Sequence, residues 1–226
     1  MTRQILLAAC AAFALATPAV AEDSYFAFFG GLSSLDNPTF SGDVTPPGGP
    51  QTVDTDFDSG FGLGVAYGRG FGALGAAARL RGEIEFSFAD SNVDSIAFSG
   101  NGPAAEINVG GDLRTSRLFG NLLVDFETGG AFTPYLGAGL GIAHTESDLV
   151  YGPGVRIDDS HTGLAAQLIA GASYRIDERW SLTGDVRYIR DFDVELDRLA
   201  PTGALTGVVE EDIDSHAVNI GLRYRF

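Results

Sequence analysis

The chain has 226 residues, of which 19% are charged, and a formal net charge of −16 at pH 7. Such an acidic protein would repel the phosphates of DNA or RNA, so nucleic acid is excluded as an expected partner. Beyond the N-terminal segment no apolar stretch approaches the roughly 18 residues that a membrane-spanning helix needs, and about 205 residues suit one domain.

Residues 1–21 carry the features of a secretory signal peptide. Arg3 supplies the positive start, residues 5–15 form an apolar run, and residues 19–21 (AVA) fit a small-residue cleavage site. We therefore expect this segment to be cleaved during export and the mature domain to span residues 22–226.

Cys10 offers a competing interpretation, because the sequence before it resembles the signal of a bacterial lipoprotein. The apolar run before Cys10 is shorter than the roughly 7–15 residues that a signal sequence has, so cleavage after residue 21 is preferred. Cys10 is the one cysteine of the chain. Its removal with the signal peptide leaves no disulfide and no thiol chemistry to expect.

Eight segments alternate between apolar and polar residues, as a β-strand with one apolar face does. They lie at residues 24–35, 57–69, 80–90, 115–127, 132–148, 162–175, 180–192 and 214–226. In the last segment Val218, Ile220 and Leu222 share one face, whereas Asn219 and Arg223 share the other. An apolar outer face, an inner face of arginines among small residues and an aromatic last residue are typical of an outer-membrane barrel strand.

The connections between these segments alternate between long and short. The long ones are residues 36–56, 91–114, 149–161 and 194–211, and the shorter ones are residues 70–79, 128–131 and 177–179. Bacterial barrels have short periplasmic turns and long extracellular loops, and an even number of strands closes without a free edge. The sequence therefore predicts an all-β fold, an eight-stranded antiparallel transmembrane β-barrel in the cell outer membrane.

Charged residues of both signs occupy the inner faces of the predicted strands. They are Arg81, Glu83, Glu85, Arg117, Asp125, Asp185, Arg187 and Arg223. The lumen of an eight-stranded barrel is just wide enough for side chains to fill, and buried charges must be paired or hydrated. We therefore expect an interior network of ion pairs that plugs the lumen, while a narrow ion path through the same charges remains the alternative.

Two segments, residues 132–141 (FTPYLGAGLG) and residues 221–226 (GLRYRF), resemble the small outer-membrane β-barrel families of Gram-negative bacteria. These are the opacity-type porins and the barrel domain of outer-membrane protein A. The resemblance implies that the barrel assembly machinery reads the C-terminal strand through Tyr224 and Phe226. It also implies a non-enzymatic role in envelope integrity and surface interaction, with a narrow porin for ions or small solutes as the alternative.

Acidic residues gather around the last long connection. They are Asp193, Glu195, Asp197, Glu210, Glu211 and Asp212. A solvated surface explains them, and divalent cations that bridge them to lipopolysaccharide phosphates are the alternative. Calcium takes six to eight oxygen ligands, and no connection has the spacing of a recognised calcium loop, so no metal or cofactor is expected. The expected partners are outer-membrane lipid and lipopolysaccharide, and the expected state is a monomer.

The segments Asp159-Ser160-His161 and Asp214-Ser215-His216 contain the residue types of a catalytic triad. Neighbouring residues on a strand point to opposite faces, so serine and histidine within one segment cannot pair. A lipid-modifying site formed by Ser215 and His161 across the barrel stays open, but we expect no catalytic residues and no enzymatic activity. His161 is expected to face the lumen and His216 the lipid, and a loop gated by histidine protonation is a further hypothesis.

Overall fold

The computed structural model describes residues 24–36, 39–44, 50–99, 103–105, 109–151, 155–199 and 202–226. The predicted signal peptide lies outside the described residues. The strands are β1 (Ser24–Leu35), β2 (Thr39–Val44), β3 (Pro50–Phe57), β4 (Gly60–Ala73), β5 (Ala78–Ser99), β6 (Pro103–Ala105), β7 (Gly110–Phe126), β8 (Phe132–Tyr151), β9 (Val155–Arg175), β10 (Trp180–Leu199) and β11 (Leu205–Arg225). In the part of the chain that is described, no helix is long and apolar enough to cross a membrane.

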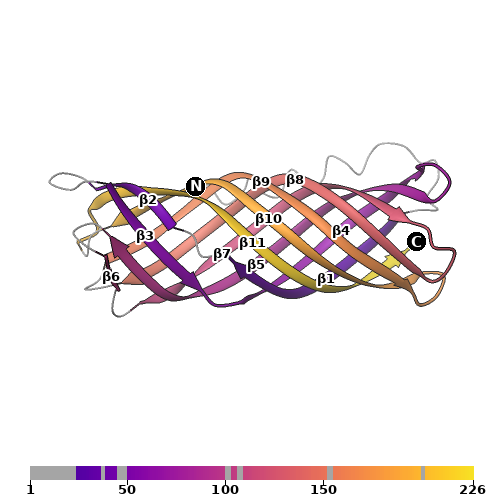
Figure 1. Ribbon diagram of the computed structural model, residues 1–226, viewed down its shortest axis with the longest axis horizontal. Coiled ribbons are helices and arrows are strands. Elements are labelled where there is room, and N and C mark those ends of the chain that lie inside the picture. Colours follow the sequence, from indigo (N-terminus) through magenta and orange to yellow (C-terminus); the bar gives the residue numbers. More distant parts are fainter. Residues whose placement is uncertain are drawn as a thin grey trace.

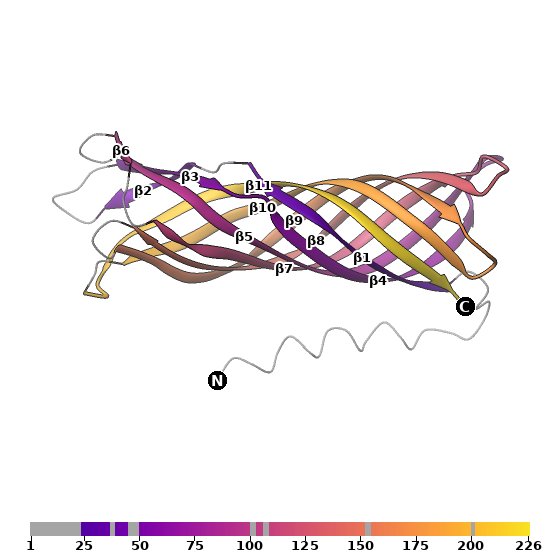
Figure 2. The same ribbon diagram turned by 90° about the horizontal axis from the view of Figure 1, so that it is seen from below.

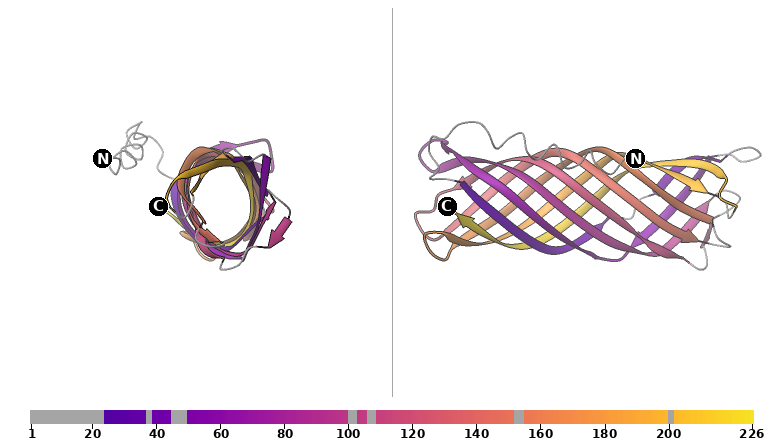
Figure 3. Two further views of the ribbon diagram at one scale, coloured as in Figure 1. Left: turned by 90° about the vertical axis from the view of Figure 1, so that its left-hand side faces the viewer. Right: turned by 180° about the vertical axis from the view of Figure 1, so that it is seen from behind.

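Eight of these strands close into an antiparallel ring, which Figure 3 shows from one end. β1 pairs with β11 on one side and β4 on the other. β5 joins β4 to β7, and β7 to β11 follow one another in chain order. Because β11 returns to β1, the ring has no free edge, and the predicted eight-stranded antiparallel barrel is confirmed.

The hairpin of β2 and β3 extends this ring at the end opposite the C-terminus (Figure 1). β2 pairs with β11, and β3 pairs with β5. These are the neighbours that β1 and β4 have lower in the barrel, so the hairpin takes over the places of those two strands. β6 adds a short further pairing to β5 at the same end. The barrel wall therefore continues as sheet well beyond the ends of β1 and the start of β4.

Five of the ring strands are about twice as long as a membrane requires. β5 has 22 residues, β9 and β11 have 21, and β8 and β10 have 20, whereas roughly 9–11 tilted residues cross the bilayer. The extra length lies at one end, where the predicted long connections are found to be mostly strand. Figure 2 shows this long tube from a second side. The turns at the other end are short, as predicted, because β7 and β8 are separated only by residues 127–131 and β9 and β10 only by residues 176–179.

The lower half of the barrel carries an apolar belt on its outer surface. Leu140, Leu168 and Ile220 are 75%, 58% and 67% exposed. Exposure of such large apolar side chains is unfavourable in water but not in lipid, so this surface suits contact with the membrane. Aromatic rings border the belt at the end with the short turns, where Phe26 stacks on Phe226 and Trp180 packs against Tyr224. This border corresponds to the periplasmic aromatic girdle of a transmembrane barrel.

The hydrophobic pattern inverts along the strands, as β10 shows. In its first half the outward residues Leu182 and Val186 are exposed and the inward residue Arg187 is buried. In its second half Leu196 is buried inside the barrel and Glu195 is exposed outside. A bulge between Asp191 and Val194 separates the two halves. The lower half therefore suits lipid outside a polar lumen, and the upper half suits water outside an apolar core.

Candidate functional site: a filled lumen below an acidic collar

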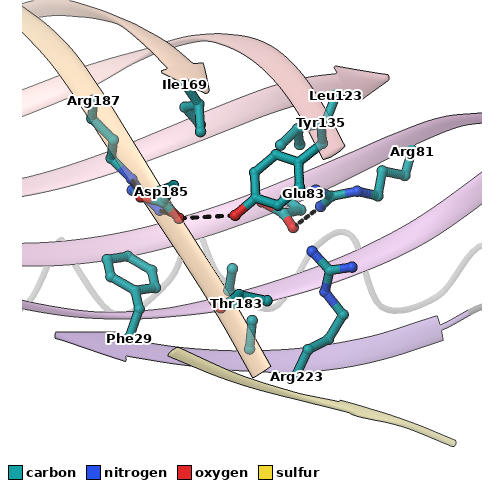
Figure 4. Close-up of a pocket in the computed structure, with 12 residues that line it drawn as sticks. Phe29, Arg81, Glu83, Leu123, Tyr135, Ile169, Thr183, Asp185, Arg187 and Arg223 are labelled. Carbon is teal, nitrogen blue, oxygen red and sulfur yellow. Dashed lines mark hydrogen bonds and ion pairs between the residues drawn. The ribbon is translucent and has the colours of Figure 1, made fainter. Parts of the chain in front are cut away.

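The periplasmic part of the lumen is filled by Arg81 and its partners (Figure 4). The Arg81 guanidinium donates Nε to Asp125 Oδ1 at 2.8 Å, Nη1 to the Tyr25 hydroxyl at 2.6 Å, and Nη1 also to Glu83. Tyr25 in turn donates its hydroxyl to Glu83 Oε1 at 2.5 Å. The ring of Tyr135 lies 4.8 Å from the guanidinium carbon. The strands β1, β5, β7 and β8 thus meet around one buried cation.

A second cluster, centred on Arg187, lies next along the lumen. Nη1 donates to Glu85 Oε1 at 2.5 Å and Nε donates to Asp185 Oδ1 at 2.7 Å. The guanidinium also lies 4.2 Å above the ring of Phe29. Asp185 accepts a further hydrogen bond from the Tyr135 hydroxyl at 3.1 Å, so the two clusters share a partner and form one continuous network.

The third cation, Arg117, pairs with a residue that was not among the predicted network members. Its Nε donates to Asp191 Oδ1 at 2.9 Å and its Nη2 to Asp191 Oδ2 at 2.6 Å, and both side chains are buried. This fork geometry satisfies both carboxylate oxygens. Asp191 follows Asp185 and Arg187 at alternating positions of one strand, so strand parity is the signal that could have identified it.

Arg223 differs from the other predicted members. Its guanidinium stacks over Tyr25 and Tyr135, at 4.8 and 5.8 Å from the ring centroids, and within the described residues it forms no ion pair. The Nε atom of Arg223 and the Nη2 atom of Arg81 are buried, and neither has a hydrogen-bond partner among the described residues. A cavity of about 20 Å³ lies beside these two arginines, which is room for a water molecule.

Neutral amides complete the network, and this role was not predicted from the sequence. Asn121 donates to Glu85 Oε2 at 3.0 Å, Gln167 donates to Asn121 Oδ1 at 2.9 Å, and Asn219 donates to Asp185 Oδ1 at 3.0 Å. Each is almost fully buried. Buried carboxylate oxygens need hydrogen-bond donors. The amides of Asn121 and Asn219 donate to carboxylate acceptor sites that the arginines do not fill.

The glycines of residues 132–141 make room for the side chains opposite. A Cβ at Gly139 would lie 2.0 Å from Asn121 Oδ1, and one at Gly137 would lie 2.7 Å from Leu123 Cγ. β7 and β8 pair these residues directly. Gly139 therefore leaves space for the neutral Asn121 side chain, and Gly137 leaves space for the apolar Leu123 side chain.

An apolar plug fills the lumen above the charged network. It consists of Leu35, Phe57, Ile96, Leu113, Leu149, Val194, Leu196 and Ile213. These residues come from β1, β3, β5, β7, β8, β10 and β11, so nearly the whole circumference contributes to it. The plug was not predicted from the sequence, because several of these residues lie in segments predicted to be long connections.

Acidic side chains surround the plug on the outside of the barrel. This acidic collar consists of the exposed or half-exposed residues Asp54, Asp56, Asp94, Glu146, Asp148, Asp193, Glu195, Asp197, Glu210, Asp212 and Asp214. Arg190 pairs with Asp214 at 2.5 Å, and Arg114 pairs with Asp90 at 3.1 Å. Among the described residues no group of three histidine, cysteine or acidic side chains is arranged to hold a metal ion.

The histidines lie at the outer rim. His144 shares a 2.7 Å hydrogen bond with Thr162 on the outer face, and His216 contacts Asp36 at 3.2 Å, also outside. Ser215 is buried inside the barrel while His216 is exposed, so the two point to opposite sides, as predicted. His161 shares the inward face of β9 with buried Ala165.

Residues 5–226 match the model of a known family, the outer membrane protein beta-barrel domain. The chain therefore belongs to this family, and it is a protein of the outer membrane. Among curated proteins it is similar to the outer membrane protein PagN of Salmonella typhimurium, with 28% identity over 229 residues that cover 93% of each chain.

Solved structures of similar fold are also outer-membrane proteins. They include Neisserial surface protein A (16% identical, TM-score 0.54, covering 93% of this chain and 100% of that one). OprG of Pseudomonas aeruginosa is 18% identical, with a TM-score of 0.54 and coverage of 91% and 98%. The outer membrane protease OmpT of Escherichia coli is 10% identical, with a TM-score of 0.55 and coverage of 93% and 99%. At these identities the likeness shows the fold alone.

Proposed function

We propose that this protein is a non-conducting, non-enzymatic barrel that contributes to envelope integrity and presents its acidic collar at the cell surface. The single observation that carries the proposal is the double filling of the lumen, by the charged network below and by the apolar plug above. An ion that moved through would have to break paired charges and then cross a layer of leucine, isoleucine, valine and phenylalanine. Each step costs desolvation energy with no compensating ligand.

The form of the protruding half supports a role in surface interaction. The collar is carried by paired strands such as β10 and β11, which hydrogen-bond up to Leu199 and Leu205. Its carboxylates are therefore held at fixed positions by a sheet. A surface of one charge sign on a rigid support attracts cationic partners, and divalent cations could link it to lipopolysaccharide phosphates.

Planar-bilayer conductance of the refolded mature protein tests the proposal. The wild type should give no current, and its heat-modifiable mobility on a gel should confirm that the barrel is folded. The variants Glu83→Ala and Arg117→Ala alone should also be silent, because the plug remains. Combining Phe57→Ala and Leu196→Ala with Arg81→Ala, Arg117→Ala and Arg187→Ala removes side chains from both layers and should give current. Steady wild-type channels whose conductance changes in Glu83→Ala or Arg117→Ala would instead establish the narrow porin.

Assembly and oligomeric state are parts of the same proposal. Tyr224 and Phe226 pack on Trp180 and Phe26 at the periplasmic girdle, and we propose that the assembly machinery recognises this strand before those contacts form. We also propose cleavage of residues 1–21 and a monomeric barrel of residues 22–226. The mass of the protein purified from outer membranes, intact and under native conditions, tests both statements.

A further inference from the structure

A groove of about 580 Å³ runs across the outside of β7, β8, β9 and β10. This volume falls within the roughly 300–1,000 Å³ of sites that bind small molecules. Gly120, Ala138 and Ala166 form its floor. They alternate with buried residues of the lumen, such as Asn121 and Gln167, so the floor faces the membrane. The groove opens on the outside of the barrel, and the inference drawn from it does not rest on the proposed function.

The floor of this groove lacks the side-chain cover that two other lipid-facing glycines, Gly30 and Gly82, have. A Cβ added at Gly30 would lie 2.8 Å from the Leu63 side chain, and one added at Gly82 would lie 2.8 Å from the ring of Phe71. At Gly120 the nearest atom would be a backbone oxygen of Leu140, 3.9 Å away. Neighbouring side chains thus fill the gaps above Gly30 and Gly82, and they leave Gly120 bare.

Leucines form the walls of the groove, and polar groups mark its outer end. Leu122, Leu140 and Leu168 line its sides, and Tyr188 and Arg190 of β10 lie at one end. Arg190 pairs directly with Ala166 across the strands, and Tyr188 pairs with Leu168, so this end adjoins the floor. It is also where the outward residues of β10 change from apolar to charged.

We propose that the groove holds one acyl chain of an outer-leaflet lipid, with the phosphorylated headgroup at Arg190. The groove is continuous with the apolar belt, which is already the interface with lipid, so hydrocarbon is the occupant that this position supplies. An uncovered floor with leucine side chains on both sides lets a chain pack more closely than the parts of the belt where side chains cover the backbone. Its outer end lies at the membrane surface, where headgroups are found.

The charges at the outer end define the headgroup. Arg190 donates Nε and Nη2 to Asp214 at 2.6 and 2.5 Å, and Asp212 lies 3.9 Å from Nη1. Tyr188 also donates its hydroxyl to Asp214, at 2.7 Å. Asp214 thereby fixes the guanidinium, and Nη1 keeps donors for a phosphate oxygen. Because two carboxylates stand beside one arginine, the headgroup that fits is a phosphorylated one that brings divalent cations with it, as lipopolysaccharide does.

Native mass spectrometry of the refolded mature barrel, titrated with lipid A in the presence of Mg²⁺, tests the proposal. One lipid A should be retained per barrel. The double variant Gly120→Val, Ala138→Leu fills the floor and should weaken retention at least tenfold. The matched control Gly184→Val, Ala170→Leu makes the same changes at lipid-facing positions outside the groove, where a Cβ at Gly184 would meet only a backbone oxygen at 3.8 Å. It should bind as the wild type does.

Several results would overturn the site. Equal retention by the groove variant and its control would, and so would several lipids bound without preference. A barrel dimer that the groove variant abolishes would assign the face to a second protein copy. Heat-modifiable mobility on a gel confirms that each variant is folded. The headgroup is tested by Arg190→Gln, which should weaken lipid A binding but leave binding of unphosphorylated diacylglycerol unchanged. A loss of both would remove Arg190 from the headgroup contact.

Discussion

Replacing Arg117 with methionine tests whether the lumen is dry at the Arg117–Asp191 pair. The two side chains are only 4% and 1% exposed and are joined by hydrogen bonds of 2.6 and 2.9 Å. Removing the arginine leaves the Asp191 carboxylate buried without its cation. Breaking one side of a buried pair costs roughly 3–5 kcal/mol of the free energy of unfolding, and we expect Arg117→Met to fall in that range.

The double variant Arg117→Met, Asp191→Leu separates the lost cation from lost packing. Replacing both members of a buried pair with apolar residues is often neutral or stabilising by roughly 1–4 kcal/mol. We therefore expect the double variant to be at least as stable as the wild type, so that the double-mutant cycle yields a large coupling energy. The assay is equilibrium denaturant unfolding from lipid vesicles. Trp180, the one tryptophan of the chain, lies in the periplasmic girdle and reports the transition by its emission.

Two results would refute this reasoning. A loss below about 1 kcal/mol for Arg117→Met would mean that water solvates Asp191, as at exposed pairs, and the lumen would be wet at this level. A double variant as unstable as the single one would mean that packing, and not an unpaired charge, is responsible. Arg114→Met is the matched control, because Arg114 makes similar contacts with Asp90 on the exposed outer face. It should change the free energy of unfolding little.

The same barrel supports three further predictions. Leu122→Arg places a charge in the apolar belt and should cost about 2–4 kcal/mol, whereas Thr162→Arg, on the outer face near the rim, should cost little in the same unfolding assay. Backbone N–H groups of Trp180 and Arg179 hold the pKa of the Asp177 carboxyl, in a periplasmic turn, below its ordinary value of 3.8. A lowered folded-state pKa adds stability above the unfolded-state pKa that is lost as the pH falls through the folded-state pKa, so the wild type should lose more stability than Asp177→Asn below about pH 4; parallel pH curves would contradict this. Phe226→Ala should reduce the barrel assembled in cells far more than it slows refolding of the purified protein into vesicles, and equal effects on both would assign Phe226 to stability alone.

The membrane half of the fold could be predicted from the sequence, because in that half apolar residues form the outward face and the charged residues of the lumen network face inward. Ile220 faces lipid and Asn219 is buried in the lumen, as parity predicted. The periplasmic ends of the strands lie within a few residues of the predicted ends. The extracellular ends of β5, β9, β10 and β11 lie seven to nine residues beyond the predicted ends, because beyond the membrane the apolar residues turn inward. Strands that are recognised by an apolar outward face are therefore predicted to end where the apolar residues change from the outer to the inner face.

The members of the lumen network could be predicted from parity, but their partners could not. Which charges meet depends on which strands are neighbours and on how the strands are staggered around the ring. Asp191 is the partner of Arg117 although 74 residues separate them. Arg223 meets Tyr25 and Tyr135 from β1 and β8, and this stacking follows from the closure of the barrel, which no local pattern records.

The inversion of the hydrophobic pattern also explains why the bilayer holds this tube at one height. Sliding it outward would bring the leucines and phenylalanines of the belt into water, and sliding it inward would bring Glu195 and its neighbours in the collar into hydrocarbon. Both movements are costly, because charges in the membrane and apolar surface in water are each unfavourable. The bulge between Asp191 and Val194 lies where β10 changes from one solvent to the other. The extra residue of this bulge shifts the alternation by one position, so that Leu196 lies in the plug and Glu195 lies in water, whereas unbroken alternation from Asp191 would turn Leu196 outward and Glu195 inward.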